Sequence, residues 1–253
     1  MACKTISVCN DKGGVGKSVI ARELAYGLAR RNCKTLLIDL APEAAQTAFI
    51  ENASTAPNTI ADVFAKQTPL INVALQVNPS LWFVAGSSDL EDIKIKWQGS
   101  ITKQYQLKKA IEATRDTYDY IIIDTQGSSD PLVISAIIAA QAVIVPMRLD
   151  SNNITVTANF LRETAELEDA VKTMPKIGIV VTHFEATSER QQTKLKQISK
   201  GWGHKVLPVI GRSRNVGEAV EAYKTLREFD PGNPRVAEYE QLFDEVQKWL
   251  NQP

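Results

Sequence analysis

Short apolar runs alternate with longer stretches of helical periodicity along the 253 residues of the chain. The runs at residues 35–39 and 120–124 are almost entirely apolar up to a final carboxylate, as in strands buried on both faces of a parallel sheet. We expect further strands at residues 5–9, 81–85, 142–147, 177–182 and 205–210. We expect helices at residues 19–31, 106–117, 131–141, 155–173, 188–201 and 235–250. The alternation predicts an α/β fold, in which residues 1–253 form a single domain with one doubly wound, mostly parallel twisted sheet and helices on both faces.

A glycine-rich segment, Asn-Asp-Lys-Gly-Gly-Val-Gly-Lys-Ser-Val, joins the first predicted strand to the first predicted helix at residues 10–19. In such a turn the backbone N–H groups converge on an anion, and the helix N-terminus adds partial positive charge. We expect Lys17 to reach the β- and γ-phosphates of a nucleoside triphosphate, and the Ser18 hydroxyl to take a Mg²⁺ position. A dinucleotide-binding loop would need glycine in place of Val19, and a turn without function would not need Lys17 and Ser18 at the start of a helix.

The loop differs from the ordinary phosphate-loop pattern, which has glycine five residues before Gly16. The chain has Asp11 there, followed by a second lysine, Lys12, so that two cations are available for one triphosphate. The expected nucleotide contacts of the loop are Lys12, Gly13, Gly14, Val15, Gly16, Lys17, Ser18 and Val19.

Two carboxylates are expected beside this loop, because ligands of such sheets bind at the carboxyl ends of the strands. Asp124 ends one apolar run and begins an Asp-Thr-Gln-Gly sequence, so it can hold Mg²⁺ opposite Ser18. Gly127 can bring a backbone N–H to the γ-phosphate, which makes residues 124–130 a candidate switch segment. Asp39 is a candidate second acidic neighbour of the metal, and Gln46 begins a helix over the nucleotide. The alternative for Asp124 is a strand-end aspartate that caps a turn.

The amino-acid composition says little about what kind of protein this is. The content of 44% hydrophobic and 23% charged residues is that of an ordinary globular protein, and 29 basic residues balance 29 acidic ones. We find no apolar run of membrane-spanning length and no signal-peptide pattern, so a cytoplasmic protein is expected. Cys3, Cys9 and Cys33 lack metal-ligand spacing and are expected to be reduced.

Basic residues gather towards the C-terminal end of the chain, where few acids accompany them. They are a solvated helix face or a set of DNA phosphate contacts, and charge patterning alone leaves both interpretations open. The DNA-binding candidates are Lys194, Lys196, Lys200, Arg212, Arg214, Lys224 and Arg227.

Three segments together resemble the ParA/MinD family of deviant Walker A ATPases, and most closely its ParA branch. Residues 12–18 resemble the deviant Walker A loop, residues 38–43 the second acidic motif, and residues 118–124 the Walker B strand. The resemblance implies ATP and Mg²⁺ as cofactors, a homodimer around two ATP molecules with Lys12 reaching the partner's phosphates, and nucleotide contacts at Pro208, Ile210 and Arg212. It also implies non-specific DNA binding, cargo positioning near the nucleoid, and a ParB-like or adaptor protein that stimulates hydrolysis.

The sequence departs from this family at the second acidic motif. The family has Asp-x-Asp-Pro, whereas this chain has Asp39-Leu-Ala41-Pro. The resemblance implies that the missing carboxylate would orient the attacking water, and that Lys12, Asp39 and Asp124 are the other catalytic positions. Ala41 therefore predicts a hydrolysis-deficient, ATP-trapped protein, either an engineered variant or a naturally slow member.

Two alternatives remain open at this point. A MinD-like ATPase would cycle on membranes, but the polar face of the last helix carries Glu238, Glu240, Asp244 and Glu245 in place of lysine and arginine. We therefore expect this helix to pack on the body of the protein, with no membrane partner. The other alternative is a conjugation or secretion accessory ATPase.

Overall fold

A computed structural model describes residues 3–169, 171 and 173–252. Within these residues an eight-stranded sheet has the order β3-β4-β2-β5-β1-β6-β7-β8, and all neighbouring strands are parallel except β3 and β4. The strands are β1 (Lys4–Val8), β2 (Thr35–Asp39), β3 (Leu75–Asn78), β4 (Leu81–Val84), β5 (Tyr120–Asp124), β6 (Ala142–Met147), β7 (Lys176–Val181) and β8 (Lys205–Val206). The predicted α/β class with a mostly parallel, doubly wound sheet is confirmed.

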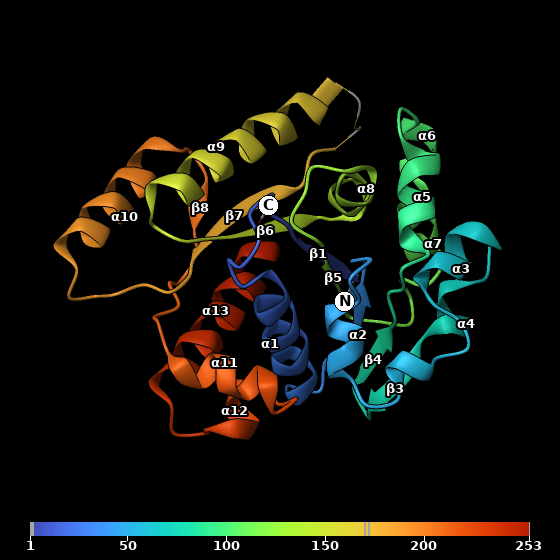
Figure 1. Ribbon diagram of the computed structural model, residues 1–253, viewed down its shortest axis with the longest axis horizontal. Helices are drawn as coiled ribbons and strands as arrows, with labels where there is room; N and C mark the ends of the chain where they lie inside the picture. Colours follow the sequence, from blue (N-terminus) through green and yellow to red (C-terminus); the bar gives the residue numbers. More distant parts are fainter. Residues whose placement is uncertain (1–2, 170, 172, 253) are drawn as a thin grey trace.

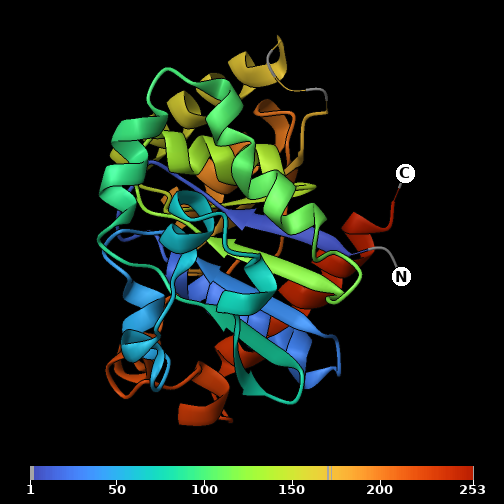
Figure 2. The same cartoon turned by 90° about the vertical axis from the view of Figure 1, so that its right-hand side faces the viewer.

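Helices cover both faces of the sheet (Figures 1 and 2). One apolar core contains side chains of α1 (Lys17–Arg30), α2 (Ala45–Phe49), α12 (Leu226–Phe229) and α13 (Pro234–Leu250). The core on the opposite face contains side chains of α3 (Ile60–Ala65), α4 (Leu70–Val73), α5 (Leu90–Trp97), α7 (Gln106–Glu112), α8 (Pro131–Ala139), α9 (Ser151–Glu166) and α10 (Glu189–Gly201). The remaining helical segments are α6 (Ile101–Gln104), α11 (Arg214–Glu221) and the 3₁₀ turns Ala53–Thr55 and Leu167–Asp169.

The central strands bring the predicted acidic positions to one edge of the sheet. β5 lies between β1 and β2, and Asp39 is the register partner of Asp124 at their carboxyl ends. All residues of β2 and β5 are buried, which agrees with their nearly continuous apolar sequences. The loop between β1 and α1 opens at this same edge because β1 is also parallel to β5.

Three predicted elements differ from the structure. The helix expected at 106–117 ends at Glu112. The strand expected at 205–210 is only two residues long, because Pro208 lacks the N–H group that a continued ladder would need. The helix expected at 155–173 begins earlier, at Ser151, because the Asp150 side chain accepts a hydrogen bond from the Asn153 N–H at 3.0 Å. It ends at Glu166, and part of the remaining predicted range lies outside the described residues.

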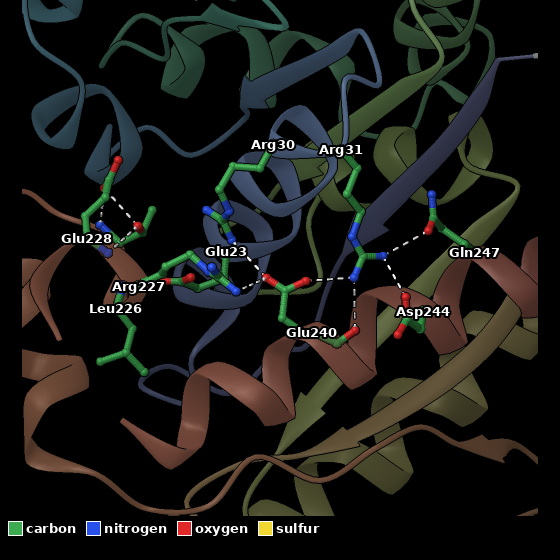
Figure 3. A network of polar contacts seen from close by, with 10 residues as sticks. Glu23, Arg30, Arg31, Leu226, Arg227, Glu228, Glu240, Asp244 and Gln247 are labelled. Carbon is green, nitrogen blue, oxygen red and sulfur yellow. Dashed lines mark hydrogen bonds and ion pairs between the residues drawn. The ribbon is translucent and has the colours of Figure 1, made fainter. Parts of the chain in front are cut away.

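The last helix packs on the body, as its sequence predicts. Its apolar face is buried against α1, where the Phe243 ring fills the space beside Gly27. Arginines from two other elements pair with its polar face. Glu240 pairs with Arg31, which directly follows α1, at 2.7 Å, and with Arg227 of α12 at 3.2 Å (Figure 3). The acidic side of α13 therefore serves intramolecular ion pairs.

Candidate functional site

The loop after β1 has the backbone of an anion-binding turn. Gly14 and Gly16 adopt φ values of 71° and 92°, a backbone conformation that residues with a side chain rarely adopt. Gly16 is also the N-cap of α1. The loop is tied to the sheet because the Thr182 hydroxyl donates to the Val15 carbonyl at 2.9 Å. The helix N-terminus is thus presented with no side chain capping it, as a phosphate group requires.

The two lysines of the loop occupy different environments. Lys17 is buried, and its ammonium donates to the Lys12 carbonyl at 2.9 Å. Burial lowers the pKa of Lys17, and the charge of Asp124 acts in the opposite direction. Lys12 is only half-buried, at the outer end of the loop. The structure therefore places Lys17 inside the site and Lys12 at its rim.

Gly127 closes the loop from the other side. A Cβ atom at Gly127 would lie 3.0 Å from the Lys17 ammonium and 3.1 Å from the Gly13 nitrogen. Only glycine fits here without displacing the loop. The segment after β5 also contacts the loop through Ser129, whose hydroxyl lies 2.5 Å from a carboxylate oxygen of Asp11. The candidate switch segment and the loop are therefore in direct contact.

Asp124 has the features of a cation ligand. It is fully buried, and neither carboxylate oxygen has a hydrogen-bond partner among the described residues. Burial and then the Asp39 charge raise the pKa of Asp124 to about 7, while the Ser18 hydroxyl and Lys17 act in the opposite direction. Two unpartnered buried oxygens beside a serine hydroxyl fit Mg²⁺, which takes few protein ligands together with phosphate oxygens. In the described part of the chain no three His, Cys, Asp or Glu side chains gather around a metal position.

Asp39 is equally buried but its oxygens are already used. One oxygen accepts from the Ala41 N–H at 3.2 Å, and the other accepts from the N–H and hydroxyl of Thr47, both at 2.9 Å. Burial raises the pKa of Asp39, and these hydrogen bonds act against the rise. Asp39 thus shapes the segment that leads from β2 into α2. The Ala41 side chain is itself buried and carries no polar atom that could contact water.

A polar residue that sequence reasoning missed lies behind this segment. Arg22 of α1 is buried beside Gln46 of α2, which is also buried and donates a hydrogen bond to the Ser18 carbonyl. Gln46 was expected to begin a helix over the nucleotide, and it lies in the first turn of α2. The sequence did not indicate that Arg22 is buried, because a single arginine in an amphipathic helix is ordinarily assigned to the solvent-exposed face.

A cleft of 1090 Å³ runs from the loop toward the carboxyl ends of β6, β7 and β8. Of the expected nucleotide contacts outside the loop, Ile210 and Arg212 line this cleft, whereas Pro208 is not among its lining residues. Arg148 also lines it, and a guanidinium nitrogen lies 3.1 Å from the His183 Nε2 atom. Burial, followed by the charges of Arg148 and Arg212, lowers the pKa of His183, so this contact favours the neutral imidazole. The cleft can hold the part of a nucleotide that extends beyond the phosphates.

The DNA-binding candidates come from two regions, α10 and the segment from Arg212 to α12. Some already have intramolecular partners. Arg212 pairs with Glu185 at 2.9 Å, Arg227 pairs with Glu240, and Lys194 donates to the Leu149 carbonyl at 3.1 Å. The other candidates, Lys196, Lys200, Arg214 and Lys224, are exposed.

Comparisons with known proteins agree with this geometry. A family model described as "AAA domain" matches residues 3–177, more than half of the chain. The chromosome partitioning protein ParA of Caulobacter vibrioides is 27% identical over 233 residues, which cover 90% of this chain and 87% of that protein. The chain belongs to this AAA domain family. Its resemblance to the ParA/MinD ATPases, on the ParA side, is confirmed, and the protein is a ParA-type ATPase.

Two solved structures share the fold. The ATP complex of a McdA variant from Cyanothece has a TM-score of 0.87 at 19% identity, covering 100% of this chain and 98% of that one. Cobyrinic acid a,c-diamide synthase from Mycobacterium smegmatis, with an ATP analog and magnesium bound, has a TM-score of 0.83 at 19% identity over 98% and 96% of the two chains. At these identities the likeness concerns the fold alone. No helix within the described residues is long and apolar enough to cross a membrane.

Proposed function

We propose that this protein binds ATP and Mg²⁺ at the 10–18 loop, dimerises in that state, binds DNA without sequence preference and positions a cargo. The observation that carries the proposal is the convergence of the buried Lys17 ammonium, the Gly127 backbone and the unpartnered Asp124 carboxylate. The ParA relative and the ATP-bound and magnesium-bound structural neighbours support the choice of ligands. The proposed partners are a second copy of the chain, DNA, and a ParB-like or adaptor protein linked to cargo.

The chemistry proposed is transfer of the γ-phosphoryl group of ATP to water. Lys17 and the backbone N–H groups of the loop would hold the phosphates, and Gly127 would bring a further N–H group toward the γ-phosphate. Ser18 and Asp124 would hold Mg²⁺, which neutralises charge that develops on the phosphate oxygens. Lys12, at the rim of the site, would reach the phosphates bound by the partner protomer.

The same geometry supports slow turnover. A methyl group at Ala41 cannot accept a hydrogen bond from water, so this position cannot align a nucleophile. The groups that bind ATP and Mg²⁺ do not depend on Ala41. Losing a water-orienting group lowers turnover more than affinity, by about 100-fold or more for a positioned acid–base group.

The test is the fate of ATP after incubation with the protein and Mg²⁺. We expect a stable dimer by light scattering that contains intact ATP, and a transient dimer with faster phosphate release for Ala41→Asp. Lys17→Ala is the control and should remain monomeric without bound nucleotide. Equal hydrolysis rates for the unchanged chain and Ala41→Asp would remove the catalytic interpretation of this position. Absence of ATP binding by the unchanged chain would overturn the proposed function.

A further inference from the structure

A charged side chain is buried directly behind the candidate metal site. Arg22 is only 3% exposed, and its guanidinium carbon lies 3.7 Å from the centre of the Phe49 ring. Within the described residues Arg22 forms no ion pair, and its Nε atom has no hydrogen-bond partner. Burying a cation in this way costs free energy that a neutral side chain of similar volume would avoid. This cost points to a role for Arg22 beyond packing.

The hydrogen-bond partner of Arg22 is Gln46, which is completely buried. A guanidinium nitrogen of Arg22 lies 3.4 Å from the Gln46 Oε1 atom, and the Nε2 group of Gln46 donates to the Ser18 carbonyl. A guanidinium can only donate and a carbonyl can only accept. Arg22 therefore fixes the orientation of the amide, with its oxygen toward the guanidinium and its NH₂ group toward Ser18.

The connection links Ser18 to the segment that Asp39 shapes, and Asp39 lies beside Asp124 in the sheet. Ser18 lies in the first turn of α1 and carries the hydroxyl proposed as a Mg²⁺ ligand. Gln46 lies in the first turn of α2, directly before Thr47, whose N–H and hydroxyl hold Asp39. The amide of Gln46 thus joins the first turn of α1 to the first turn of α2. A metal ligand is held in place by hydrogen bonds of this kind from residues that do not touch the metal.

We propose that Arg22 is a positioning residue that acts through Gln46 to hold Ser18 and the start of α2 in the arrangement that binds Mg²⁺. The inference rests on the proposed function, because it concerns the same site, but it adds the buried Arg22–Gln46 pair to the residues that shape this site. The Phe49 ring covers the guanidinium, and the Arg22 side chain is almost completely shielded from solvent. Arg22 should therefore affect the response of the protein to Mg²⁺ more than its affinity for the nucleotide alone.

The test compares binding of a nonhydrolysable ATP analogue with and without Mg²⁺ by calorimetry. Gln46→Leu removes the amide and retains most of the volume, and Arg22→Met does the same for the guanidinium. We expect each to reduce the Mg²⁺-dependent gain in affinity about threefold to tenfold, as for loss of one buried hydrogen bond, with Mg²⁺-free affinity changed less than about twofold. Arg22→Lys, which keeps the charge but not the planar fork, should recover only part of the gain.

The control is Ser135→Ala, which removes a buried hydroxyl that donates to the Leu132 carbonyl at 2.7 Å in α8, away from the site. It should leave the Mg²⁺ effect unchanged. Adding Arg22→Met to Gln46→Leu should cost little more, because both act through one amide. Additive losses, or an unchanged Mg²⁺ effect in either single variant, would overturn the inference. If the unchanged chain binds the analogue no better than Lys17→Ala, the proposed function itself fails.

Discussion

At the scale of single residues, the two loop lysines are distinguished by where their side chains lie. Lys17 is enclosed by the loop and by Gly127, whereas Lys12 contributes its carbonyl to the site and carries its side chain at the rim. The same residue type therefore has two expected roles within one loop. Spacing in the sequence suggested this difference, and the burial of Lys17 gives it a physical basis.

We predict that Lys17→Ala abolishes ATP binding, whereas Lys12→Ala binds ATP but does not dimerise. The first change removes the buried cation that we propose to contact the phosphates, and the second removes only a side chain at the rim. Calorimetry with ATP and light scattering measure the two effects separately. A dimeric Lys12→Ala protein would exclude the role of Lys12 across the interface.

The pKa of Asp124, raised to about 7, predicts a pH dependence of Mg²⁺ binding. The proton and the metal compete for the same carboxylate, so Mg²⁺ affinity should rise with pH through about 7 and then level off. Between about pH 7 and about pH 6 we expect a loss of about fivefold in the Mg²⁺ effect on ATP binding, from competition by one proton. Titration calorimetry across this range is the measurement. Asp124→Asn should bind Mg²⁺ weakly at every pH, and a pH profile like that of the unchanged chain in this variant would assign the titration to another group.

Folding stability of the metal-free protein should depend on pH in the opposite direction to Mg²⁺ affinity. The folded protein holds a proton on Asp124 up to about pH 7, whereas an unfolded aspartate releases it near the ordinary pKa of 3.8. The metal-free protein should therefore lose stability as pH rises between these values, and Mg²⁺ with ATP should restore it.

At the scale of secondary structure, the long apolar strands and the helices with clear caps could be predicted from the sequence. β2 and β5 are recognisable because they are buried on both faces, and α10 because Ser188 caps it. The short helices α4 and α6 could not be predicted, because four residues show no periodicity and depend on tertiary packing. The burial of Arg22 was missed because its charge suggests the surface, and only the tertiary structure brings Phe49 and Gln46 against it.

The contact between α1 and α13 gives a stability prediction. A Cβ atom at Gly27 would lie 2.1 Å from the Phe243 ring, so Gly27→Ala must displace the ring or the helix. We expect a loss of about 1–3 kcal/mol in the free energy of unfolding, as for other overpacked cores. Urea denaturation measures it.

Gly217→Ala is the matched control for this prediction. Gly217 lies inside α11, and a Cβ atom there would meet nothing within 4 Å. The change should therefore be neutral or stabilising by up to about 1 kcal/mol through helix propensity. Equal destabilisation by both substitutions would show that the Phe243 contact is not the cause.

At the scale of the whole molecule, the DNA-binding candidates lie on α10 and on the segment from Arg212 to α12, and two of them, Arg212 and Arg227, pair with acidic side chains. Lys196 and Lys200 are exposed on α10. For Lys196→Ala and Lys200→Ala in the ATP-bound state, we predict weaker binding to duplex DNA of any sequence. The slope of log affinity against log salt should fall by about 0.9 for each phosphate that the variant no longer neutralises.

Fluorescence anisotropy at several salt concentrations measures this slope. Lys66→Ala is the control, because Lys66 lies beside α3 and pairs with Asp62 at 2.6 Å. It should leave the slope unchanged. An unchanged slope in both α10 variants would move the DNA contacts away from this helix.

Helix α1 connects the phosphate loop to the interior of the molecule. Its N-terminus closes the loop, its middle carries Arg22 and Glu23, and its C-terminal half packs on α13. Most of its residues are buried. Amide hydrogens in such a helix exchange with solvent only through large-scale opening of the molecule. A ligand bound at its N-terminus therefore stabilises the helix against the same opening that exposes the cores, so nucleotide occupancy is coupled to the lifetime of the folded chain as a whole.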